Sequence, residues 1–242
     1  MPWKSVAVDG MAFAGTPQDT GLQSMTEKQT IVVWDVPVRL FHWTLLAVTA
    51  LAFATAEAEG AWFVLHLAAG YAVMALLVFR LAWGFAGTRY ARFGEFVYPW
   101  PVVRRHAANV ARLRPRRYVG HNPLGGWMIM ALLVVLGLLV ASGLFAGDEG
   151  EKGPLAHWLS AGVADAIGEL HEGLNTVLWT LVAVHVAGVV IESLLTGENL
   201  IRALWTGKKE VENAEADSGP VGALPLMASL VLAVAAVIAV AW

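Results

Sequence analysis

The sequence predicts an all-α integral membrane protein, built as a four-helix bundle with a fifth transmembrane helix at its C-terminal end. Composition is the first observation: of 242 residues, 57% are hydrophobic and only 14% are charged, whereas soluble domains carry about 25% charged residues. The second observation is that the apolar residues gather in long stretches. The third is that several stretches carry a histidine, which is costly at membrane depth and marks a functional site.

Five stretches are each close to the twenty or so residues needed to cross about 30 Å of hydrocarbon. They run over Val38–Ala56, Phe63–Phe85, Leu124–Phe145, Leu174–Leu195 and Val221–Trp242. Lipid offers the backbone no hydrogen-bond partners, so each stretch should be a helix. The last one has no histidine and no charged residue, and we expect it to be a lipid-facing anchor or a surface for a partner helix.

The chain divides into three segments. Residues 1–30 should form a loosely ordered cytoplasmic extension, because they lack the basic start and apolar core of a secretory signal. Residues 31–209 should form the four-helix transmembrane domain. Residues 210–242 should hold the fifth helix, preceded by a polar, acidic linker that we place at residues 208–219.

Basic residues predict how the chain is oriented in a bacterial inner membrane. Nine of the sixteen Lys and Arg residues lie between Arg80 and Arg117, so the connection there should be cytoplasmic. The first-to-second and third-to-fourth connections are acidic and should face the periplasm. The N-terminus is then cytoplasmic and the C-terminus periplasmic.

Two connections should contain short helices. Residues 102–114 can form an amphipathic helix whose arginines meet anionic lipid of the inner leaflet. Pro99 and Pro101 should prevent helix formation just before it. On the periplasmic side, a short interfacial helix should begin near Pro154, with Trp158 as a membrane-surface anchor.

Four histidines lie in or at the ends of apolar stretches: His42, His66, His171 and His185. The last two are fourteen residues apart on one helix, a spacing that separates them by about 21 Å along roughly the same face. In the predicted topology His42 and His185 share the inner depth, and His66 and His171 share the outer depth. Each pair could provide both axial ligands of a haem iron between facing helices.

Two alternatives stay open at this point, namely a histidine-based metal transporter and histidines that serve packing alone. Zinc is a weaker interpretation, because the stretches lack companion Asp, Glu or Cys ligands at useful spacing. The chain has no cysteine, which excludes thiolate-bound clusters and the covalent attachment of a c-type haem. Any haem must be held non-covalently.

Other polar residues have both a functional and a structural interpretation. Arg39 and Arg80 could each bind a haem propionate or anchor the chain at the inner surface. His121 and Arg117, at the inner entry of the third span, could meet a quinone head group or be satisfied by water. We expect His106 to be solvated and His157 to lie at the outer surface.

Several motifs resemble the bacterial cytochrome b561 family, which includes the cytochrome b subunits of nickel–iron hydrogenases. The opening run VWDVPVRLFHW at 33–43 matches the family pattern W-D-x-x-x-R-x-x-H-W. Further matches follow in the expected order: LHLAAGY at 65–71, FRLAWGF at 79–85, GHNPLGG at 120–126, LHE at 170–172, HVAG at 185–188 and ENL at 198–200.

The resemblance implies two haem b groups, with His42, His66, His171 and His185 as axial ligands. It also implies electron transfer between a periplasmic redox partner and the quinone pool. The acidic outer connections favour a positively charged partner such as a c-type cytochrome, and a hydrogenase-like subunit is another candidate. A stand-alone superoxide:quinone oxidoreductase is the alternative enzyme. Membrane lipid and quinone are expected partners, an oligomer is compatible with the sequence, and nucleic acid is not expected.

Overall fold

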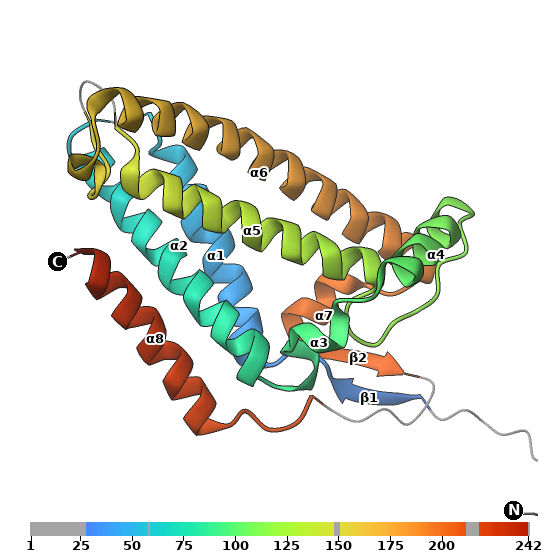
Figure 1. The fold of residues 1–242 in the computed structure, drawn as a ribbon. Coiled ribbons are helices and arrows are strands. Elements are labelled where there is room, and N and C mark those ends of the chain that lie inside the picture. Colours follow the sequence, from blue (N-terminus) through green and yellow to red (C-terminus); the bar gives the residue numbers. More distant parts are fainter. Residues whose placement is uncertain (1–27, 58, 148–150, 212–217, 242) are drawn as a thin grey trace, which may run out of the picture.

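The computed structural model describes residues 28–57, 59–147, 151–211 and 218–241 (Figure 1). Within them, five helices are long and apolar enough to cross a membrane. They are α1 (Val36–Ala54), α2 (Ala61–Ala86), α5 (Pro123–Phe145), α6 (Ala161–Thr196) and α8 (Ala223–Ala241). The prediction of an all-α, multi-pass membrane protein is confirmed.

Neighbouring helices pack in an order that leaves α6 and α8 on opposite sides of the other three (Figure 1). The helix α2 packs against α1, α5 and α8, and α5 also packs against α6. Large apolar side chains such as Leu77, Leu133 and Leu178 fill the shared core. Trp83, near the end of α2, is fully buried.

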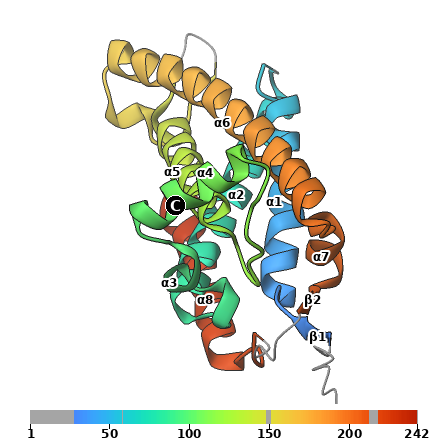
Figure 2. The ribbon, with the colours of Figure 1, turned by 90° about the vertical axis from the view of Figure 1, so that its right-hand side faces the viewer.

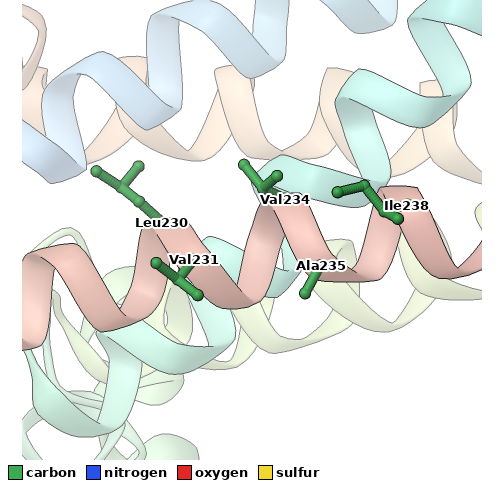
Figure 3. A pocket seen from close by; sticks show the side chains of 5 residues that line it. All are labelled: Leu230, Val231, Val234, Ala235 and Ile238. Carbon is green, nitrogen blue, oxygen red and sulfur yellow. The ribbon is translucent and has the colours of Figure 1, made fainter.

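The fifth helix is more than a lipid-facing anchor, because small residues on one of its faces are buried. Ser229 and Ala233, one turn apart, are 2% and 6% exposed. Small residues allow close approach between membrane helices. Elsewhere on α8, only apolar side chains line a shallow groove (Figure 3): Leu230, Val231, Val234, Ala235 and Ile238.

The helix α6 is longer than the apolar stretch that predicted it. It begins at Ala161, where we expected Leu174, and its 36 residues correspond to a length of about 54 Å. That exceeds the hydrocarbon thickness of about 30 Å. The additional turns carry Asp165 and Glu169, both exposed.

Short elements gather at one end of the bundle, as Figure 2 shows for α7 (Leu200–Thr206) and the two strands. The strands β1 (Gln29–Val32) and β2 (Lys208–Val211) pair antiparallel, with Ile31 opposite Lys209. The expected linker therefore begins as a strand, and the prediction was wrong for residues 208–211. β-branched residues at 30–33 favour this pairing. Residues 1–27 of the expected extension lie outside the described residues.

The connection between α2 and α5 contains η1 (Arg89–Ala91), α3 (Phe93–Phe96) and α4 (Trp100–Ala111). The amphipathic helix that we expected is present but starts earlier. Pro101 does not prevent it, because proline is tolerated in the first helical turn. On the opposite side a short 3-10 helix, η2 (Ala156–Trp158), leaves Trp158 68% exposed.

Candidate haem sites

The predicted outer pair is brought together. The ring centres of His66 on α2 and His171 on α6 are 6.3 Å apart. A metal–imidazole bond is about 2 Å long and the bonding nitrogen lies about 1 Å from the ring centre, so two imidazoles on opposite sides of one metal ion have ring centres about 6 Å apart. The spacing therefore suits two axial ligands of a single iron.

Hydrogen bonds orient both outer imidazoles. His66 Nδ1 lies 2.8 Å from the Ala52 carbonyl oxygen, which can only accept, so Nδ1 carries the hydrogen. Ser142 Oγ donates to the Leu139 carbonyl at 3.1 Å and lies 3.0 Å from His171 Nδ1, so that nitrogen is also the donor. Each ring keeps the lone pair on Nε2 free for a metal, because the hydrogen bond at Nδ1 fixes which ring nitrogen carries the proton.

The inner histidines lie toward the other end of the bundle, where the structure brings them near each other without the ring contact that His66 makes with His171. His42 on α1 and His185 on α6 lie within electrostatic range of each other. His42 Nδ1 is buried without a hydrogen-bond partner. His121 lies near both rings and near Arg80.

Glycines next to the paired histidines leave open space. A Cβ atom added at Gly70 or Gly188 would meet nothing within 4 Å. Gly70 and Gly188 follow His66 and His185 by about one turn, on the same helix faces. A flat macrocycle needs such open space between helices, so the histidines and their surroundings fit haem b.

Two residues that support His171 were missed in the sequence. A Cβ atom at Gly143 would lie 2.9 Å from Cε1 of His171, and Ser142 holds its Nδ1. Both are on α5, and nothing near His171 in the sequence points to them. A small residue pair in an otherwise bulky apolar stretch was the only available signal.

The two arginines differ in their surroundings. Arg80 is 3% exposed, its guanidinium lies 4.9 Å from the centre of the Phe93 ring, and its Nη1 has no hydrogen-bond partner. Burial disfavours a role as a surface anchor and leaves a cation available for a carboxylate. Arg39 instead donates from Nη1 to the Trp205 carbonyl oxygen at 2.7 Å and so braces α1 against α7.

The residues suggested for quinone are separately engaged. The His121 ring packs between Trp34 and Phe96, with ring centres 4.4 and 4.7 Å away. Burial, together with nearby Arg80 and Lys209, lowers the pKa of His121 to about 3, so it is neutral at pH 7. Arg117 donates to the Thr196 carbonyl oxygen from Nε and Nη2, at 3.1 and 2.6 Å, and thereby holds the end of α6.

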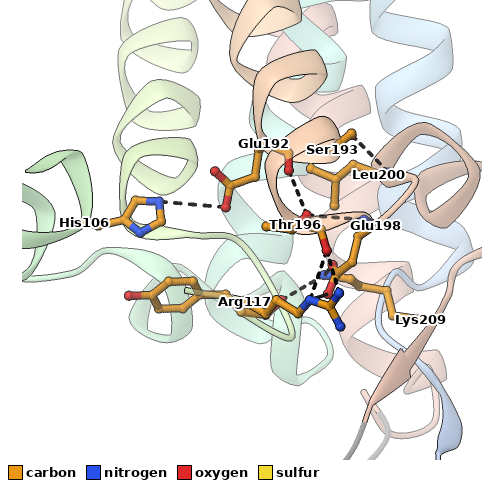
Figure 4. Close-up of polar contacts among 9 residues, drawn as sticks. His106, Arg117, Glu192, Ser193, Thr196, Glu198, Leu200 and Lys209 are labelled. Atoms are coloured by element: carbon orange, nitrogen blue, oxygen red, sulfur yellow. Dashed lines mark hydrogen bonds and ion pairs between the residues drawn. The ribbon is translucent and has the colours of Figure 1, made fainter. Parts of the chain in front are cut away.

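The prediction that His106 is solvated was wrong. It is 2% exposed, and its Nε2 lies 3.9 Å from Glu192 Oε1 on α6 (Figure 4). The apolar face of α4 turns it toward the bundle, a tertiary effect that the basic local sequence concealed. His157 is exposed, as expected.

A bundle of helices long enough to cross a membrane, in which His66 and His171 face each other, fits a membrane-embedded b-type cytochrome. The chain belongs to the prokaryotic cytochrome b561 family, whose model matches residues 33–207. Membership implies haem b and electron transfer, and both agree with the site.

Relatives cover most of the chain. A probable Ni/Fe-hydrogenase B-type cytochrome subunit of Rhizobium leguminosarum bv. viciae is 24% identical over 223 residues, covering 78% of this chain and 92% of the relative. A protein of the same description from Azotobacter chroococcum mcd 1 is 28% identical over 228 residues, covering 76% and 91%. No solved structure matches the chain significantly.

Proposed function

We propose that the protein carries electrons across the bacterial inner membrane between a periplasmic redox partner and quinone, through two haem b groups. His66 and His171 would hold the outer group, and His42 and His185 the inner one. The observation that carries the proposal is the 6.3 Å separation of the two outer imidazoles, with both Nδ1 atoms engaged. A haem bound by two histidines takes up and releases single electrons and leaves no open position for oxygen.

The protein supports this chemistry by orienting the axial ligands and by offering cations to the propionates. Ala52 and Ser142 fix the outer rings through their Nδ1 hydrogens. Arg80 offers an unpaired N–H for a propionate, and a charge-assisted bond of this kind is about twice as strong as a neutral one. Arg39 retains an unpaired Nε for the same use.

Charge supports the assignment of sides and partners. Basic residues at the end that holds α4 favour the cytoplasm, whereas Asp165 and Glu169 project from the opposite end on α6 and would attract a positively charged partner. The relatives are described as hydrogenase subunits, so a hydrogenase-like subunit is the alternative partner. Quinone would bind at the inner end near His121, a neutral ring, with Arg117 at the edge of that region.

Quinol-driven reduction of the purified protein in liposomes tests the proposal. Addition of a quinol should produce sharp b-type bands in the reduced-minus-oxidised spectrum, and an added c-type cytochrome should then exchange electrons with the protein. Failure of quinol to reduce a protein that dithionite does reduce would contradict the quinone assignment. Superoxide-driven quinone reduction without any partner would instead support the stand-alone oxidoreductase.

A further inference from the structure

The inner end of the bundle contains a buried acid–base pair that the electron route does not use. His106 on α4 and Glu192 on α6 lie 3.9 Å apart between Nε2 and Oε1, and their side chains are 1% and 10% exposed. Neither His106 nitrogen has a hydrogen-bond partner. A buried carboxylate is costly unless it is paired or protonated, so the presence of this pair needs an explanation.

Nearby charges are largely engaged with one another. Lys209 Nζ lies 2.7 Å from Glu198 and donates to the Tyr118 carbonyl oxygen at 2.8 Å. Arg117 is held at the end of α6 and lies 3.8 Å from Glu198 (Figure 4). Glu198 and Lys209, which carry opposite charges, both interact electrostatically with Glu192, and His106 Nε2 lies 3.9 Å from its carboxylate.

The pair is placed between water and the expected quinone region. On one side, α4 presents exposed Arg104 and Arg105 next to His106. On the other side, the amide of Asn122 faces the Glu192 carboxylate, and Asn122 directly follows His121. Burial lowers the pKa of His106, so at pH 7 its ring is neutral and can both accept and donate a proton.

We propose that His106 and Glu192 pass protons between cytoplasmic water and quinone, an inference that rests on the proposed function. Reduction of one quinone to quinol consumes two electrons, supplied through the protein by the periplasmic partner, and two protons. For each proton, the O–H bond of protonated Glu192 breaks and a quinone O–H bond forms. His106 then takes up a proton from cytoplasmic water at Nδ1 and gives the proton on Nε2, which faces Glu192, to the carboxylate, so its ring is neutral before and after the step. Because 3.9 Å exceeds a direct hydrogen bond, a bridging water or a small rotation completes the path. Quinol oxidation runs the same steps in reverse.

Comparing two reductants of the haem-loaded protein isolates the proton step. Dithionite delivers electrons without quinone protons, whereas quinol must release two protons. In Glu192→Gln we expect quinol-driven haem reduction to slow at least tenfold and to lose its pH dependence, with dithionite reduction unchanged. Redox-difference infrared spectra should show a carboxyl C=O band in the wild type that is absent from the variant. Glu210→Gln, an exposed position on β2, is the matched control and should keep every wild-type property.

The outcomes separate this inference from the function on which it rests. Equal quinol rates and pH profiles in the wild type and Glu192→Gln would overturn the inference alone. Equal slowing with dithionite and quinol would also overturn it, because that result indicates a structural role. If quinol fails to reduce even the wild type, the proposed function falls and takes the inference with it. If Glu192→Gln loses haem, His106→Gln decides by the same measurements.

Discussion

At the residue scale, Asp35 joins the first two transmembrane helices. It is 4% exposed and accepts hydrogen bonds from the Val38 backbone N–H at 2.7 Å, Trp83 Nε1 at 2.9 Å and Thr88 Oγ1 at 2.6 Å. Asp35 belongs to the same motif at 33–43 as His42. Besides the predicted haem ligand, this motif therefore contains a residue that holds the start of α1 against the end of α2.

Replacement of Asp35 with Ala should strongly destabilise the protein. It leaves buried donors without an acceptor, and each unsatisfied group costs about 1–3 kcal/mol. We expect a loss of about 3 kcal/mol or more, measured by thermal unfolding in detergent, with Asp35→Asn less affected. A midpoint for Asp35→Ala within error of the wild type would show that water or a rearranged loop replaces the carboxylate.

His106 should make stability depend on pH. Burial lowers its pKa in the folded state, so the unfolded chain binds the proton more readily. The contribution of neutral His106 to the free energy of unfolding is complete above about pH 6.5, the pKa of histidine in the unfolded chain. This contribution decreases as the pH falls below that value. Comparing unfolding midpoints at pH 7.5 and 5.5, we expect His106→Gln to lose less stability on acidification than the wild type. The exposed His157→Gln should lose as much as the wild type, and equal losses in all three proteins would contradict the prediction.

Glycines in the transmembrane helices show where two segments pack closely and where space is left for a ligand. A Cβ atom at Gly126 on α5 would overlap the carbonyl oxygen of Phe96, whereas one at Gly70 on α2 would meet open space. Gly126→Ala should therefore lower the unfolding midpoint, because backbone must shift. Gly70→Leu should keep the helical circular dichroism signal but lower the haem content, because its side chain would occupy the proposed haem space.

An exposed glycine provides the control for this comparison. Gly94→Ala also adds a Cβ atom in open space, but far along the chain from the paired histidines, and should change neither property. Full haem content in Gly70→Leu would mean that the open space beside His66 serves another purpose.

Hydropathy located the elements better than it located their ends or contacts. The paired depths of the histidines followed from alternating topology and apolar spans alone. The length of α6 could not be predicted in this way, because charged residues such as Asp165 lower the hydropathy without ending a helix that continues into water. The burial of His106 and the support of His171 by Ser142 could not be predicted from the apolar spans either, because both depend on side chains from another helix.

At the scale of the whole molecule, α8 is an addition to the four-helix bundle. It packs on α2, on the side of the bundle away from α6 (Figure 1). A chain that ends at Gly219 should therefore keep its haem content but unfold at a lower temperature, because α2 loses the contacts around Ser229 and Ala233. Absorbance at the haem bands and a thermal melt of the same sample measure both. Loss of haem from the shortened chain would show that α8 helps to form the haem sites.

In the proposed arrangement, two histidine pairs hold two haems at two depths of one bundle. Haem per chain, determined by pyridine haemochrome in the wild type, His42→Ala, His66→Ala and the exposed control His157→Ala, tests it most directly. We predict two haems in the wild type and the control, and one in each of the other variants, with the remaining haem still giving b-type bands. A wild type with one haem or none, or two haems retained in His66→Ala, would contradict the proposed arrangement of two haems.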